Sequence, residues 1–286
     1  MTARTREDIA QAFVAACHAE LQALKPGNVH IHAPGHGMDI SHFEKAAAAA
    51  APFIADPSLS VGKRILQATE ASFGATGLNT NLGIVLLCAP LAKAAAETDA
   101  STGLRRRLAV ILGTLTKDDA DDAFAAIRIA NPAGLGKVDN GDVTASAAPR
   151  MTLIEAMQLA RDRDRIANAY VTAFEDIFDF ALPVLDQART SAAREDLAVS
   201  TLHMALLAEF PDSHIARKYG PAKALEVRDA ARELASAWSP AVTQKSFNTL
   251  KEFDLSLKSR GLNPGTTADF VVATLFTSLM SRRKLS

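Results

Sequence analysis

The residues best suited to chemistry are gathered in a few polar, glycine-rich breaks between apolar segments. The first break, residues 25–42, begins Lys-Pro-Gly-Asn and holds four histidines and an aspartate. Four histidines so close together could bind a metal ion, but their spacing matches no common zinc pattern. A ligand-contacting loop and a solvated loop are the alternatives, and the prolines and glycines predict a fixed shape. The residues of interest here are Lys25, Asn28, His30, His32, His36, Asp39 and His42.

A second polar cluster occupies residues 70–83. Its Asn-Thr-Asn run offers side-chain donors and acceptors at the start of the next apolar segment. Helix capping would explain one of these residues but not the whole cluster, so we interpret the segment as a ligand contact. The residues of interest are Glu70, Thr76, Asn79, Thr80 and Asn81.

A third break, residues 134–143, contains Gly-x-Gly and two aspartates. No predicted strand precedes it, so a dinucleotide-binding turn is excluded. Asp139 or Asp142 could still help to hold a magnesium ion, because Mg²⁺ prefers carboxylate, water and phosphate oxygens. A flexible connector is the alternative interpretation.

A fourth break, residues 211–220, is interpreted as a polar loop. Arg217 and Lys218 provide adjacent positive charge that could bind a phosphate chain, with surface salt bridges as the alternative. Further on, Asp269 lies where the last apolar helix begins, a position at which a carboxylate also favours the helix N-terminus.

The composition excludes several classes of function. The 286 residues include 31 basic and 32 acidic side chains, so no bulk positive charge is available for a nucleic acid. The first residues lack the apolar core of a signal peptide, and the longest apolar run, 82–92, is shorter than the roughly 20 residues that span a membrane. Cys17 and Cys88 lie in apolar runs, which favours buried reduced thiols over a disulfide or a nucleophile. We expect a cytoplasmic protein without nucleic-acid or membrane partners, for which a homodimer is possible.

The elements that must position these residues are helices. Alanine is abundant, and apolar residues recur at helical spacing with almost no period-two alternation. Residues 1–286 are therefore predicted to form one large all-α domain, with a ligand site built from loops at helix ends. Ser41 with Glu44 and Thr152 with Glu155 have the spacing of capping boxes. Helices are predicted over residues 8–24, 41–54, 60–75, 84–97, 104–115, 118–131, 152–161, 166–182, 194–209, 221–238, 244–261 and 267–280.

Taken together, the breaks resemble the motifs of the triphosphoribosyl-dephospho-CoA synthase family, in the same order over about residues 10–280. The matching segments are KPGNV (25–29), GMD with a following phenylalanine (37–43), ATGLNTNLG (75–83), DSHIARK (212–218) and NPGTTADF followed by ATLF (263–276). The joint pattern is specific, whereas each segment alone is a moderate signal.

This resemblance implies an all-helical transferase. Members of the family move the triphosphoribosyl part of ATP to dephospho-CoA and release adenine, which makes the precursor of an acyl-carrier prosthetic group. The resemblance places Lys25, Arg217 and Lys218 at phosphates, and Asn79 and Thr80 at ribose or phosphate. Mg²⁺ is expected with ATP. The other implied roles are catalysis for Asp39, Glu70 and Asp212, metal binding for Asp39, Glu70 and Asp142, and substrate binding for Asn28, His30, Thr76, Asn81 and Asp269.

Three departures from the family pattern keep alternatives open. After Lys25-Pro-Gly this chain has Asn-Val-His at 28–30, where the family pattern would have a leucine or valine and an aspartate. The family's Asn-Thr-His-Lys-Gly is here Asn-Thr-Asn-Leu-Gly at 79–83, and Lys218-Tyr219 replace a glycine pair. One hypothesis is therefore the ATP-dependent transfer to dephospho-CoA. A second is a transferase that builds a C1-carrier coenzyme, of the tetrahydromethanopterin or methanofuran type, from another phosphorylated donor or acceptor. A third is a helical protein that binds a nucleotide or coenzyme without turnover.

Overall fold

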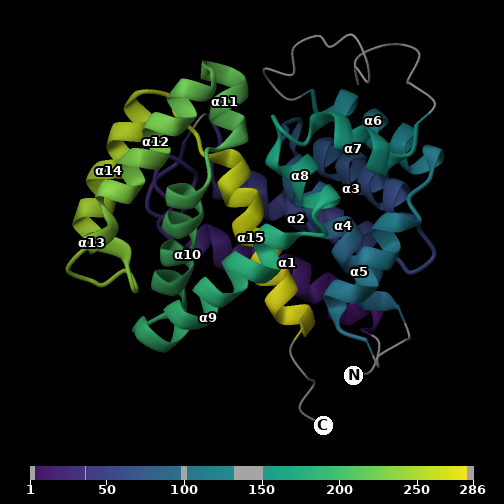
Figure 1. Cartoon of the computed structure of the whole chain (residues 1–286), viewed down its shortest axis with the longest axis horizontal. Helices are drawn as coiled ribbons and strands as arrows, with labels where there is room; N and C mark the ends of the chain where they lie inside the picture. Colours follow the sequence, from purple (N-terminus) through teal and green to yellow (C-terminus); the bar gives the residue numbers. More distant parts are fainter. Residues whose placement is uncertain (1–3, 36, 98–101, 132–150, 282–286) are drawn as a thin grey trace. The chain divides into compact units, whose positions relative to one another are not determined.

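The computed structural model describes residues 4–35, 37–97, 102–131 and 151–281. Within these ranges the chain forms fifteen α-helices and one π-helical segment, and the extended pairing seen there is limited to two isolated bridges in residues 30–38. The prediction of an all-α fold is confirmed (Figure 1). None of the described helices is both long enough and apolar enough to cross a membrane.

The chain divides into two compact units, each built from separate stretches of sequence. Unit 1 comprises Met1–Ala16, His42–Glu175 and Phe276–Ser286, and unit 2 comprises Cys17–Ser41 and Asp176–Leu275. Helices α1 and α15 each contribute to both units. The prediction of a single domain over residues 1–286 remains a prediction.

Unit 1 is arranged around α4, whose side chains are buried on almost every face, as expected of a helix that is apolar all round. Helices α3, α5, α6 and α8 pack against it. The helices of this unit are α1 (Arg6–Gln22, to Ala16), α2 (Ile40–Ile54), α3 (Val61–Thr76), α4 (Leu82–Ala96), α5 (Leu104–Gly113), α6 (Lys117–Ala130), α7 (Leu153–Ala160), α8 (Arg165–Val171) and the end of α15 (Gly265–Ser281).

Helix starts were predicted with mixed success. Thr152 and Glu155 form the predicted capping box of α7. The capping box predicted for Ser41 is wrong, because α2 begins one residue earlier, at Ile40. Instead, the Asp39 carboxylate accepts from the Ser41 backbone N–H (2.9 Å) and hydroxyl (2.7 Å). Asp39 therefore takes the capping position that the sequence pattern assigned to its neighbour.

The helix predicted over 166–182 is interrupted. Ala173 and Phe174 adopt left-handed backbone angles (φ 50° and 62°), and the π-helix η1 (Asp176–Ala181) follows. The Phe174 N–H donates to the Ala169 carbonyl (2.7 Å), and its buried ring packs beside Tyr170. Apolar spacing cannot reveal this break, because both residues at the break are apolar.

Gly62 sets the distance between α3 and α6. A Cβ at this position would lie 2.4 Å from the Asp119 Cα, and the Gly62 N–H donates to Asp119 Oδ1 (2.7 Å). We expect Gly62→Ala to lower the free energy of unfolding by roughly 1–3 kcal/mol, because the crowded atoms are backbone and the helices must separate. Gly74→Ala, in the same helix but with no atom within 4 Å of its Cβ, should instead raise it by roughly 0.5–1 kcal/mol. Urea denaturation of both variants tests the pair, and equal effects would contradict it.

Unit 2 is arranged around α10, in which every side chain from 197 to 208 is buried. Helices α9, α12 and α13 and the segment η1 pack against it. Its core joins apolar side chains of α10, α12 and α14, such as Leu207, Val227 and Leu250. The remaining helices of this unit are α9 (Leu182–Ser191), α10 (Glu195–Glu209), α11 (Ser213–Tyr219), α12 (Pro221–Glu233), α13 (Ala235–Trp238), α14 (Phe247–Ser259), the end of α1 and most of α15.

The break predicted at residues 211–220 is a helix for most of its length. Helix α11 covers Ser213–Tyr219, and the Asp212 side chain accepts from the Ile215 N–H at its start (3.0 Å). The prediction of a loop is wrong because the polar side chains of this segment were taken to indicate a solvated loop. The fully buried Ile215 gives this short polar helix its apolar face.

Candidate active site

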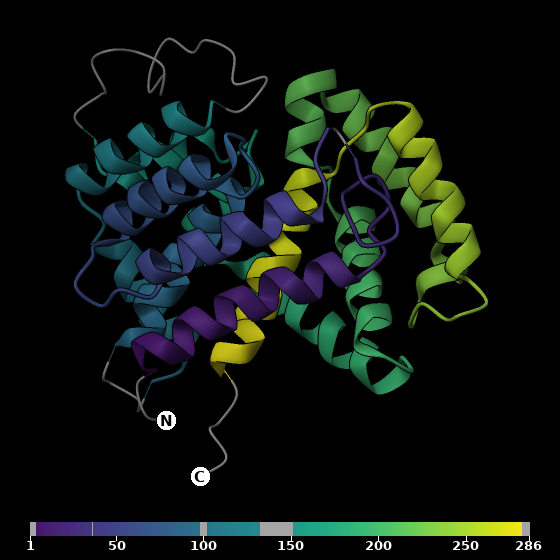
Figure 2. The same cartoon turned by 180° about the vertical axis from the view of Figure 1, so that it is seen from behind.

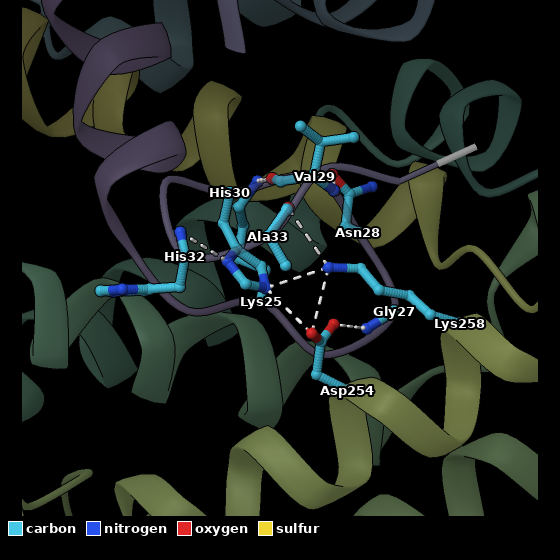
Figure 3. A network of polar contacts seen from close by, with 9 residues as sticks. All are labelled: Lys25, Gly27, Asn28, Val29, His30, His32, Ala33, Asp254 and Lys258. Atoms are coloured by element: carbon cyan, nitrogen blue, oxygen red, sulfur yellow. Dashed lines mark hydrogen bonds and ion pairs between the residues drawn. The ribbon is translucent and has the colours of Figure 1, made fainter. Parts of the chain in front are cut away.

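The Lys-Pro-Gly-Asn loop of unit 2 forms the centre of a buried polar network (Figure 3). Lys25 is fully buried, and its ammonium donates to Glu20, to the Val29 carbonyl (2.6 Å) and to Asn28 Oδ1 (3.4 Å). An ammonium has three donors, so all of them have partners inside the protein. Lys25 therefore holds its own loop in shape, which differs from the phosphate contact that was predicted for it.

The Glu20–Lys25 ion pair lies almost entirely out of water. Burial raises the pKa of Glu20 and lowers the pKa of Lys25, in both cases against the attraction between the two charges. Each group is tolerated in the interior because the other is present.

Gly27 connects this loop to α14. Its N–H donates to Asp254 Oδ1 (2.8 Å), and its φ of 84° lies in the left-handed region. A Cβ here would lie 2.7 Å from Pro264 and 2.8 Å from the Leu262 carbonyl. Only glycine fits this position, which brings the loop against α14 (Figure 2).

His30 continues the network, and its Nε2 lies 3.2 Å from the Lys258 ammonium as well as close to Asp254. Its Nδ1 accepts from the His32 N–H (3.2 Å), which leaves the proton of the neutral ring on Nε2, 3.2 Å from Asp254 Oδ2. Burial lowers the pKa of His30, and the Asp254 hydrogen bond opposes this only in part. Burial acts to raise the pKa of Asp254, but hydrogen bonds from His30, Gly27 and Lys258 outweigh it, and the net pKa is lowered. The pair is thus a neutral imidazole that donates to a carboxylate.

Two side chains join this loop and α11 to the start of α15. Asn28 Nδ2 donates to Asn263 Oδ1 (2.9 Å), just before the helix. Asp212, whose Oδ1 caps α11, uses Oδ2 to accept from the N–H (2.7 Å) and hydroxyl (2.8 Å) of Thr267 in the first turn of α15. Both Asp212 oxygens thus satisfy helix N-termini, a structural use of a residue predicted to be catalytic.

The predicted cationic residues lie on α11. Arg217 is half-buried and Lys218 is exposed, with its ammonium 5.2 Å from the centre of the Tyr219 ring. Asp269 lies in α15, half-buried and one turn after Gly265. In unit 2, Asp212 thus links the start of α11, the helix that carries Arg217, to the start of α15.

The predicted residues of the segment 70–83 belong to unit 1. Glu70 and Asn79 are exposed, Thr76 is half-buried, and Thr80 and Asn81 are buried. Among the described residues the Thr80 hydroxyl has no hydrogen-bond partner. The other polar side chains mainly bond local groups, which accounts for part of the cluster by capping and packing. These contacts are Thr76 Oγ1 to the Ser72 carbonyl (2.9 Å), Leu82 N–H to Asn79 Oδ1 (3.4 Å) and Asn81 Nδ2 to Ser72 Oγ (3.0 Å).

The predicted metal ligands are not gathered into a cluster in the part of the chain that the structure describes. No group of three or more His, Cys, Asp or Glu side chains there could hold a metal ion. Asp39 belongs to unit 2 and Glu70 to unit 1, and both are exposed. The exposed His32 ring packs edge-on against Phe247 (5.2 Å between centres). Asp139, Asp142 and His36 lie outside the described residues.

Sequence reasoning missed four members of this region. Asp254 and Lys258 are four residues apart in α14, a spacing typical of a solvated helix pair, so nothing marked Asp254 as buried or Lys258 as half-buried. Glu20 lies among the apolar residues of α1, and its partner Lys25 was assigned to a ligand. His203, fully buried in α10, lies in an apolar run, which predicts a core position. A carboxylate on the apolar face of α1, in helical register with Phe13, Ala16 and Cys17, was the one signal that could have found Glu20.

Comparison with known protein families identifies the family of this chain. The sequence matches the CitG family, described as ATP:dephospho-CoA triphosphoribosyl transferase, over residues 6–286. The chain belongs to this family. It is therefore a transferase of the triphosphoribosyl-dephospho-CoA synthase type, and the resemblance read from the sequence is confirmed.

Structural comparison agrees with the assignment of the fold. A crystal structure of a candidate triphosphoribosyl-dephospho-CoA synthase from Archaeoglobus fulgidus is similar to this chain, with a TM-score of 0.62 and 22% identity. The similarity covers 82% of this chain and 97% of that chain. At this identity it shows a shared fold. No curated protein matches the sequence significantly.

Proposed function

We propose that this CitG-family transferase moves the triphosphoribosyl group of ATP to dephospho-CoA and releases adenine. The family match over residues 6–286 carries this proposal. The five motif segments lie in the order expected of the family, and two of them meet in unit 2 through the Asp212–Thr267 contacts.

The reaction makes clear demands on the protein. Breaking the bond between adenine and ribose builds positive charge at the anomeric carbon, which carboxylates stabilise, and the leaving base needs a proton. We assign Asp269 to the developing charge and Arg217 and Lys218 to the triphosphate. Asp212 and Lys25 would act indirectly, by fixing the start of α15 and the loop beside α14.

Magnesium would enter with the nucleotide. Mg²⁺ is usually held by one or two carboxylates together with substrate phosphates rather than by an all-protein cage, so a single carboxylate beside the triphosphate would suffice. When bound, Mg²⁺ neutralises charge on the triphosphate. We assign two carboxylates of unit 2, Asp39 and Asp269, either to Mg²⁺ or to the positive charge that develops at the anomeric carbon.

A different acceptor is the second possibility, favoured by one observation. Where the family pattern has a histidine and a lysine, this chain has the buried Asn81 and Leu82. The loss of two ionisable groups would suit a precursor of a C1-carrier coenzyme with fewer charges than dephospho-CoA.

Mass spectrometry of reactions with ATP, Mg²⁺ and a panel of coenzyme precursors tests both proposals. Adenine and a triphosphoribosylated product with dephospho-CoA are expected. Adenine release only with another precursor would move the function to the second candidate. Intact ATP with every acceptor would overturn ATP as the donor.

Arg217→Ala is expected to weaken ATP binding at least tenfold, about 1.4 kcal/mol, because a guanidinium contact to phosphate is lost. Calorimetry with a non-hydrolysable ATP analogue measures this. Arg228→Ala is the control, since Arg228 pairs with its neighbour Asp229 on α12 (2.8 Å) and should leave affinity unchanged. Equal affinities for the wild type and Arg217→Ala would remove Arg217 from the site.

A further inference from the structure

A half-buried histidine, His214, lies directly over the first residue of α15. A Cβ built on Gly265 would be 3.0 Å from His214 Nδ1 and 3.5 Å from its Cγ. The imidazole thus occupies space that is open only because residue 265 is glycine. This contact lies within unit 2.

Helix periodicity brings two further groups to this contact. His214 and Arg217 are three residues apart and share a face of α11. Gly265 and Asp269 are four residues apart and share a face of α15. Helical side chains lean toward the N-terminus, so Asp269 leans toward Gly265 and Arg217 toward His214. The face of α11 that carries His214 and Arg217 therefore meets the face of α15 that carries Gly265 and Asp269.

We propose that His214 is the general acid that protonates the leaving adenine. This assignment rests on the function proposed above. The reaction needs a general acid, which sequence reasoning did not identify. Imidazole is suited to the role because its ordinary pKa lies near neutral pH. The charged groups on the same faces of the two packed helices are Arg217 on α11 and Asp269 on α15, and Asp212 lies directly before α11.

The step balances in protons and electrons. The bond between the anomeric carbon and adenine breaks, and its electron pair goes to the base. A ring nitrogen of adenine takes a proton from the His214 imidazolium. The acceptor hydroxyl oxygen bonds to the anomeric carbon, and its proton goes to the Asp269 carboxylate. Solvent then returns one proton from Asp269 to His214, so none is gained or lost overall.

The test measures adenine release by the full chain from ATP and dephospho-CoA between pH 5.5 and 8.5. His214→Gln should lower kcat at least 100-fold while the affinity for an ATP analogue changes less than threefold. Imidazole added to His214→Ala should restore kcat at least tenfold. His18→Gln, at an exposed position in α1, is the matched control and should match the wild type.

Each outcome decides a different point. If His214→Gln stays within threefold of the wild-type kcat with the same pH profile, His214 is not the acid. If His214→Gln does not fold, the Gly265→Ala variant tests the assignment instead, because its methyl group displaces the imidazole. Its kcat should fall at least threefold, and an unchanged kcat overturns the assignment. If the wild type releases no adenine, the proposed function itself fails, and the assignment falls with it.

Discussion

Lys25→Met is expected to lower the free energy of unfolding by roughly 3–5 kcal/mol, because it leaves the Glu20 carboxylate buried without its partner. The ammonium also holds the Val29 carbonyl and Asn28, so the loop beside α14 loses its inner anchor. Urea denaturation followed by circular dichroism measures the loss.

A double variant and a surface control separate the causes. Glu20→Leu combined with Lys25→Met should recover most of the loss, because no unpaired charge remains in the interior. Lys223→Met removes an exposed partner of Glu226 and should cost under about 1 kcal/mol. If Lys25→Met instead left stability intact but abolished ATP binding, Lys25 would be a phosphate ligand, as the resemblance implied.

Acid is expected to destabilise the protein through His203, by about 2 kcal/mol between pH 7 and pH 5. Burial, and secondarily the charge of Lys25, lowers the pKa of His203 to about 3. In the unfolded chain a histidine takes up a proton near pH 6.5, whereas the folded chain stays neutral until about pH 3. The contribution to stability is therefore complete above pH 6.5 and is lost as the pH falls through this window.

His203→Met isolates this contribution. The Pro26 carbonyl raises the pKa of His203 in part, yet neither ring nitrogen makes a hydrogen bond of acceptable geometry within the described residues. Replacing two unsatisfied buried nitrogens by an apolar side chain should be neutral or stabilising at pH 7. Denaturation at pH 7 and pH 5 should show that the variant loses less free energy of unfolding than the wild type. This difference between the two proteins is due to His203, because the burial-lowered pKa of His30 affects both of them. Equal acid effects would contradict the assignment.

The amino-acid sequence by itself determined the helical class, most helix positions and the family. Apolar residues at helical spacing, with glycine and proline at the breaks, specify helices locally, and α6, α7 and α10 lie close to their predicted ranges. The motif segments identified the family because their residue types and order are readable without coordinates. Lys25, Asn28 and His30 were correctly placed in one shaped loop.

Only the tertiary structure decided what those side chains contact. Lys25 pairs with Glu20 because both side chains are buried together. His30 pairs with Asp254, 224 positions along the chain, across packing that no local pattern encodes. Asp212 resembled a catalytic carboxylate, but contacts 55 residues away use its second oxygen to cap α15. His214 became a candidate acid only because Gly265 lies under its ring. The residue type determines which chemical roles a side chain can have. Its burial and its long-range partners determine which of these roles it has in the folded protein, and both depend on how the helices pack.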